Sequence, residues 1–260
     1  MAQLDDHAPV RSVARAVDVL LALGRGPMRL GDVSTAVSLS KPTTYRLLTT
    51  LRSKGMVVQD AVTSEYGLGP ACFHLMSSVA NGDAGFILEA GPALKILRDK
   101  TEETVTVHVR AGLSRICIQE FPSPHPIRYI AGMGATAGIH VGSAGKVLLA
   151  FMPEPDRERI LLDLTPDAMT ENTITDVVAL RLELAKVAEA GIATSFGERV
   201  QGAMGVSAPI LDANGTALAA LSVLGPADRL AGPSLDTATE LVRRTAEEIG
   251  RRIRRSLVTG

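Results

Sequence analysis

The stretch from residue 34 to 51, STAVSLSKPTTYRLLTTL, constrains the fold of this chain most strongly, because it has the pattern of the second half of a helix-turn-helix. Pro42 suits the first turn of a helix, where its missing N–H group is not needed, and Ser40 or Lys41 stands at the cap position. Four residues then follow the i, i+3, i+4, i+7 spacing of a helix face that packs on other helices: Thr44, Leu47, Leu48 and Leu51. This spacing predicts a recognition helix.

The other faces of this helix carry side chains that can donate hydrogen bonds to phosphates or base edges. Because the N-terminal end of a recognition helix enters the major groove, we expect double-stranded operator DNA to be contacted there. The residues expected to make these contacts are Ser40, Lys41, Thr43, Thr44, Tyr45, Arg46 and Arg52. The formal net charge of the chain is −1, but no acidic residue lies between positions 41 and 54. The positive charge is therefore concentrated on the predicted recognition helix.

Two helices are expected before the recognition helix and a hairpin after it. Apolar spacing predicts a first helix over residues 11–24, with Ser12 as its N-cap, and a short second helix over 29–37. Residues 56–58 and 66–68 are expected to pair as a wing that holds acidic residues and no cation. An ordinary three-helix subdomain with a solvated polar face is the alternative, but the complete order of these elements favours a winged helix-turn-helix that binds DNA.

The rest of the chain has the pattern of an α+β domain. Residues 104–110 alternate strictly, which predicts a strand that turns into a second strand over 115–121, and His108 is expected on its polar face. Further strands are expected at 127–131, 192–198, 203–212 and 216–225. Helices are expected at 86–101, 155–164, 175–190 and 233–256, the third capped by Thr175 or Asp176.

The glycine-rich stretch 132–152 resembles a nucleotide-binding loop only superficially. A P-loop needs glycine six residues before its lysine and a hydroxyl residue after it, but His140 and Val147 occupy those positions. Ser143 and Ser207 lack the flanking glycines of a nucleophile elbow. We predict instead a loop that opens a helix near Ser143, whose free N–H groups could receive a carboxylate.

Neither a cofactor nor a metal is expected, since the two cysteines and five histidines show no ligand spacing. The N-terminal residues MAQLDDHAPV lack the pattern of a signal peptide, and no apolar run reaches the roughly 18 residues of a membrane span. We therefore expect a cytoplasmic protein with no membrane partner.

Several separated motifs in the right order resemble the IclR family of bacterial transcriptional regulators. They are AVDVLLAL, LGDVSTAVSLSKPTTYRLLTTLRSKGMV, YGLG, GKVLLA and SAPILDANGTALAALSVLGP. The resemblance covers nearly the whole chain. It implies a winged helix-turn-helix over 1–70, a linker helix over 71–83, and an effector-binding domain over 84–260 with a sheet-and-helix fold related to GAF and PAS modules. It also implies a homodimer or a dimer of dimers on the operator.

The family resemblance and the side-chain types together identify candidate contacts for a small-molecule effector. These are Met133, Gly138, His140, Ser143, Ser195, Glu198, Met204, Ser222 and Leu224. Leu224 occupies a position that is polar in family members regulated by small oxo-acids. With Met133 and Met204 as further apolar lining, the sequence favours an aromatic or branched carboxylic acid from a catabolic pathway.

Two other functions compete with the ligand-responsive regulator. A small-molecule enzyme with an accessory N-terminal domain would use the glycine-rich loop and Glu198, but the sequence offers it no convergent nucleophile, base or cofactor motif. A constitutive DNA-binding module whose second domain no longer binds a ligand is the third possibility.

Overall fold

The computed structural model describes residues 10–72, 75 and 90–259. The chain divides into two compact units, Met1–Asn81 and Gly82–Gly260. Most of the linker helix predicted over 71–83 lies outside the described residues, although residues 70–72 are helical. Within the described part of the chain, no helix combines the length and the apolar character that a membrane span requires.

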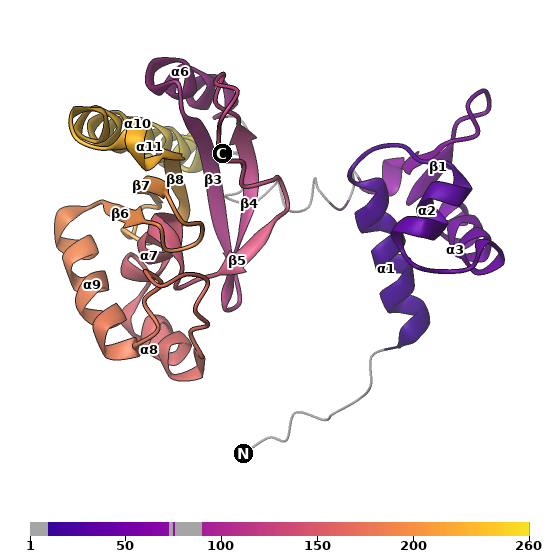
Figure 1. Ribbon diagram of the computed structural model, residues 1–260, viewed down its shortest axis with the longest axis horizontal. Helices are drawn as coiled ribbons and strands as arrows, with labels where there is room; N and C mark the ends of the chain where they lie inside the picture. The colour runs from indigo at the N-terminus through magenta and orange to yellow at the C-terminus, as the bar shows by residue number, and fades with distance from the viewer. Residues whose placement is uncertain (1–9, 73–74, 76–89, 260) are drawn as a thin grey trace. The chain divides into compact units, whose positions relative to one another are not determined.

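The first unit is a winged helix-turn-helix (Figure 1). Its helices are α1 (Arg11–Leu23), α2 (Leu30–Ala36) and α3 (Lys41–Ser53), and its wing pairs β1 (Val57–Gln59) with β2 (Tyr66–Leu68) in antiparallel register. Its core is formed by Val19, Leu23, Val33, Leu48, Leu51, Val57 and Tyr66. Gly55 follows α3 with a positive φ of 69°, which lets the chain reverse into β1. The predicted order of elements is confirmed.

Helix α1 differs from its prediction in two ways. It begins at Arg11 with Val10 in the cap position and no side-chain capping bond, so Ser12 is not its N-cap. The helix also carries two apolar faces, since Val19 and Leu23 enter the core while another stripe is exposed. The exposed stripe, which we call the outer α1 face, consists of Val10, Val13, Val17 and Leu21.

The second unit is built on a six-stranded antiparallel sheet in the order β5-β4-β3-β8-β7-β6. The strands are β3 (Thr104–Ala111), β4 (Ser114–Phe121), β5 (Thr136–Gly138), β6 (Ala193–Phe196), β7 (Ala203–Leu211) and β8 (Ala217–Pro226). The helices are α6 (Gly91–Thr101), α7 (Gly142–Ala150), α8 (Glu154–Asp163), α9 (Val177–Ala190), α10 (Ala227–Leu230) and α11 (Pro233–Thr259). This mixture confirms the predicted α+β class.

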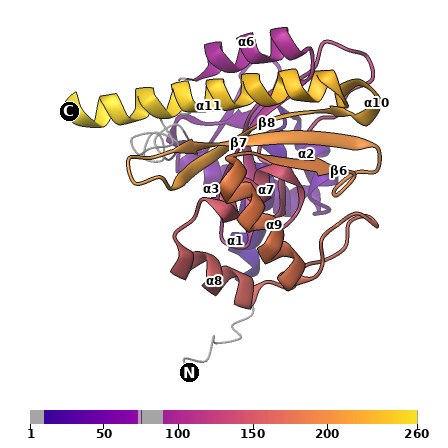
Figure 2. The ribbon, with the colours of Figure 1, turned by 90° about the vertical axis from the view of Figure 1, so that its left-hand side faces the viewer.

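Strand alternation gives the sheet two differently used faces. Val107, Val206 and Leu221 belong to the core that α6 and α11 cover, and Figure 2 shows these two helices stacked on that side of the sheet. The opposite face carries α7, which packs on β6, β7 and β8 and is in turn covered by α9. The residues that directly precede or follow these core residues along each strand therefore point to the opposite face, toward α7.

Two predictions about the sheet are wrong. Residues 127–131 form no strand, because their backbone is bonded to side chains: Thr104 Oγ1 donates to the Tyr129 carbonyl (2.7 Å), and Glu120 accepts from the N–H groups of Ala131 and Gly132 (2.6 and 3.1 Å). The edge beside β4 is occupied instead by β5, from the stretch that was expected to be a loop. Asp176, by contrast, caps α9 as predicted by accepting from the N–H groups of Val178 and Ala179.

Candidate functional site

The predicted DNA-contacting surface lies at the exposed side of α3. Lys41, Tyr45 and Arg46 are exposed, and the Ser40 and Thr43 hydroxyls bond to each other at 2.9 Å at the start of the helix. Thr44 must be removed from this surface, because its side chain is fully buried and its hydroxyl donates to the Ser40 carbonyl (3.1 Å). It therefore holds the first turn of the helix in place.

The wing is held together and to α3 by polar side chains. Arg52 donates to the Gln59 side chain on β1 at 3.0 Å, so this cation joins the recognition helix to the wing. Asp60 accepts from the N–H groups of Val62 and Thr63 (2.8 and 2.7 Å), and these bonds lower the pKa of its carboxyl group. Asp60 therefore builds the turn of the wing.

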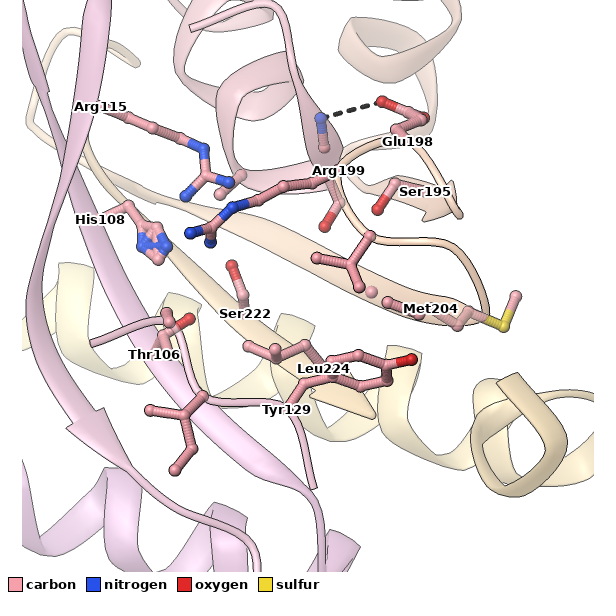
Figure 3. Close-up of a pocket in the computed structure, with 18 residues that line it drawn as sticks. Thr106, His108, Arg115, Tyr129, Ser195, Glu198, Arg199, Met204, Ser222 and Leu224 are labelled. Carbon is pink, nitrogen blue, oxygen red and sulfur yellow. Dashed lines mark hydrogen bonds between the residues drawn. The ribbon is translucent and has the colours of Figure 1, made fainter. Parts of the chain in front are cut away.

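A pocket lies between the sheet and the N-terminal end of α7 (Figure 3). Strand alternation brings Thr106 and His108 of β3 beside Ser222 and Leu224 of β8 on the face that points toward α7. Met204 and Gly205 of β7 continue this wall, and the segment around Tyr129 closes it. The cavity has a volume of about 120 Å³.

Two arginines and a histidine meet in this pocket. Figure 3 shows the guanidinium groups of Arg115 and Arg199 and the ring of His108 pointing into the same region. Arg115 is buried, and its pKa falls to about 10 through burial and, secondarily, the charge of Arg199. Burial, then Arg115 and Arg199, hold the pKa of His108 well below its usual value, so the imidazole is neutral.

Glu198 ties the loop after β6 to α7. Its carboxylate accepts from the N–H group of Gly142 (2.9 Å) and from Lys146 Nζ (2.7 Å), and Lys146, which is only 2% exposed, also bonds Glu183 at 3.0 Å. The hydroxyl of Thr173 donates to the Glu198 carbonyl (2.7 Å). The helix terminus that was expected to receive a ligand carboxylate is thus occupied by a carboxylate of the chain itself.

The buried hydroxyls beside the pocket bond to one another. Ser207 Oγ lies 2.8 Å from Ser143 Oγ and 2.7 Å from Ser222 Oγ, and these three residues come from β7, α7 and β8. No imidazole or carboxylate among the described residues is hydrogen-bonded to these hydroxyls. The arrangement lacks the base that activates a serine nucleophile.

Six of the predicted effector contacts line this one pocket: Ser143, Ser195, Glu198, Met204, Ser222 and Leu224. Three do not. Met133 is 71% exposed, and the buried His140 ring is bonded to the Asp167 carbonyl (3.1 Å) rather than to the pocket. Gly138 lies in β5 with its nearest side-chain neighbour in His140.

The pocket also contains residues that sequence reasoning missed. Arg115 and Arg199 were not selected, and His108 was expected to face a polar surface, yet it is buried. Thr106, Tyr129 and Gly142 line the pocket too. The strand pattern did offer a signal for Arg115. Residues two positions apart in a strand share a face, so a charged Arg115 on the same face as the apolar Cys117 indicates a cation that points toward the interior.

Acidification is expected to destabilise the effector unit through His108. The pKa of His108 in the folded protein lies below the value of about 6.5 that it has in the unfolded chain. Between these two pKa values only the unfolded state gains a proton, so the free energy of unfolding falls by up to about 1.4 kcal/mol per pH unit. Thermal unfolding at pH 7.5 and 5.5 should show a smaller loss for His108→Asn than for the wild type. His125→Asn, at a more exposed histidine, is the control, and an equal loss in all three proteins would contradict the assignment.

Comparison with known proteins identifies the family. A model described as "IclR helix-turn-helix domain" matches residues 12–61, and one described as "Bacterial transcriptional regulator IclR C-terminal" matches residues 82–251. The chain belongs to the IclR family of bacterial transcriptional regulators. Its members are described as transcriptional regulators and not as enzymes, which excludes the alternative hypothesis of a small-molecule enzyme.

Relatives match the chain over nearly its whole length. The HTH-type transcriptional regulator BhcR of Paracoccus denitrificans is 28% identical, over 94% of this chain and 88% of BhcR. The HTH-type transcriptional repressor AllR of Salmonella typhi is 30% identical, over 92% and 88%. A crystal structure of an IclR homologue from Microbacterium hydrocarbonoxydans, complexed with 4-hydroxybenzoate, has the same fold, with a TM-score of 0.74, 22% identity, and coverage of 94% and 99%.

Proposed function

We propose that this regulator responds to a small organic acid, which binds the pocket of the second unit and changes operator binding by α3. The observation that carries the proposal is a cationic pocket in the same chain as a DNA-reading helix. A second unit kept only for structure would gain nothing from two guanidinium groups without an ion-pair partner among the described residues, because burying such charges is costly. The pocket therefore counts against a constitutive regulator.

In this proposal residues 1–70 read DNA, residues 71–83 connect, and residues 84–260 bind the effector. A ligand can shift operator binding only if it binds the DNA-competent and DNA-incompetent arrangements with different affinities. We place the difference in the orientation of the connecting segment, and the protein acts in the cytoplasm, where its DNA lies.

We further propose that the regulator is a homodimer that binds DNA as a dimer or as a dimer of dimers. The outer α1 face exposes four apolar side chains at helical spacing, and a second copy of this face is the occupant that we assign to it. Helix-turn-helix dimers read two half-sites about one helical turn apart, so pairing through α1 would set two recognition helices on one face of the duplex.

A mobility-shift experiment tests the proposal. A duplex selected from a random library by the wild-type protein is titrated with and without a panel of small carboxylic acids at fixed salt, because affinity for DNA depends on salt. We expect at least one acid to change operator affinity, and the operator to change affinity for that acid by the same factor. Operator binding that no acid in the panel alters would contradict a ligand-responsive regulator.

A further inference from the structure

The pocket holds two positive charges that form no salt bridge with a carboxylate among the described residues. Glu198 is the only carboxylate among its lining residues, and it is already engaged by Lys146 and by the N–H group of Gly142. Arg115 donates from Nε to the Val141 carbonyl (3.3 Å), and no salt bridge joins Arg115 or Arg199 to a carboxylate among the described residues. Both guanidinium groups are therefore available to a ligand.

The charge of the pocket indicates the charge of the ligand. Arg115 and Arg199 each carry a guanidinium group, which stays charged in proteins, whereas burial keeps the pKa of His108 low, so its ring adds no third charge. A guanidinium binds a carboxylate through two parallel N–H···O bonds, so two guanidinium groups can engage two carboxylates. A ligand with one negative charge would leave either the buried Arg115 or the half-buried Arg199 without a carboxylate partner, and an unpaired charge is costly where it is buried.

Unpartnered polar atoms on β3 favour a ligand that can form hydrogen bonds with them. Thr106 Oγ1 and His108 Nδ1 are buried without a hydrogen-bond partner, and both residues line the pocket. Buried polar atoms without partners are rare in proteins, because each costs free energy. A ligand that carries carboxylate oxygens would satisfy them, whereas an aromatic ring would not.

The size of the cavity limits the ligand further. A volume of about 120 Å³ is smaller than the roughly 150 Å³ of an engineered cavity that accepts benzene. The cavity therefore suits a small ligand. Short dicarboxylates are among the smallest acids that carry two negative charges.

We propose that the effector is a short-chain dicarboxylate and that Arg115 and Arg199 are the residues that select it. This inference rests on the proposed function, because it names the chemical class of the acid that the pocket takes. It differs from the aromatic or branched acid expected from the sequence, because two cations line the pocket beside Met204 and Leu224, while Met133 lies outside it.

Calorimetry on the full-length protein tests the proposal with matched pairs of acids. Malonate is compared with propionate and succinate with butyrate, because each pair differs by the exchange of a carboxylate for a methyl group. We expect the better dicarboxylate to bind about tenfold or more tighter than its monocarboxylate partner, the difference that one charge-assisted contact supplies. Inorganic phosphate is included as a dianion without a carbon chain.

Variants identify the source of this preference. Arg199→Gln removes one charge from a half-buried residue and should abolish most of the preference for the dicarboxylate, while Arg115→Gln provides an independent second variant. Arg110→Gln removes the same charge from an exposed residue of β3 and should leave the preference unchanged. Thermal unfolding of each variant shows that it is folded.

Several outcomes would overturn the proposal. These are equal or tighter binding of the monocarboxylate, an unchanged preference in both Arg199→Gln and Arg115→Gln, tighter binding of phosphate than of either dicarboxylate, or binding of none of these acids. Mobility shifts run in parallel separate this inference from the proposed function. A dicarboxylate that binds without changing operator affinity would contradict only the proposed function, and an operator response confined to monocarboxylates would contradict only this inference.

Discussion

Arg46→Ala is expected to weaken operator binding on the order of a hundredfold, because Arg46 is exposed on the side of α3 that we expect to face DNA. Few other cations can compensate, since the wing carries none and Arg52 is bonded to Gln59. The expected loss is therefore larger than that of any wing variant. Mobility shifts at fixed salt on a duplex selected by the wild-type protein measure the effect.

Two control variants make this result specific. Val62→Ala changes the tip of the wing, where the side chain is 92% exposed, and should alter affinity by less than about threefold. Arg110→Ala removes the same charge from the other unit and should have no effect on operator affinity. Equal losses from Arg46→Ala and Val62→Ala would show that the wing shares the binding.

Gly145→Ala should unfold or strongly destabilise the second unit. A Cβ atom at this position would lie 2.0 Å from the carbonyl oxygen of Ile139, and backbone cannot give way as a flexible side chain does. Gly145 thus permits the close approach of α7 to the loop before it. We expect a loss of about 4 kcal/mol or more, which corresponds to a fall of roughly 10 °C in the Tm of a unit of this size.

The control for this prediction is Gly91→Ala in α6 of the same unit. A Cβ atom there would meet only Phe121 at 3.8 Å, which is ordinary van der Waals contact. Its Tm should therefore stay close to that of the wild type. A Tm for Gly145→Ala within about 2 °C of the wild type would mean that α7 can shift away from Ile139 at little cost.

The DNA-binding unit was predictable because its signals are local. The stripe of Thr44, Leu48 and Leu51 defines the buried side of α3 through spacing alone, and the structure buries all three. From the sequence, Thr44 was expected both in the buried stripe and among the residues that contact DNA. Its side chain is buried, so it belongs to the stripe alone. Helix periodicity thus located the buried side of α3, and the surface expected to contact DNA stays a prediction without Thr44.

The pocket was only partly predictable because its cations come from distant segments. Arg115 lies in a strand and Arg199 in a loop 84 positions later, and no periodic pattern connects them. The alternation around His108 indicated correctly that its side chain points away from Val107, but not that α7 covers that face. The predicted strand at 127–131 failed for a related reason, since side chains of Thr104 and Glu120 bind its backbone.

The neighbouring positions of Glu198 and Arg199 affect how a ligand would bind. The carboxylate of Glu198 is fastened to α7, and the backbone of its loop accepts hydrogen bonds from Thr170 and Thr173, so Arg199 projects from a segment that is already fixed. Ordering a loose loop on binding consumes conformational entropy that would otherwise appear as affinity. This loop is held in place by contacts within the chain, so in the proposed selection of a dicarboxylate by Arg199 no free energy is spent on ordering the loop that carries it.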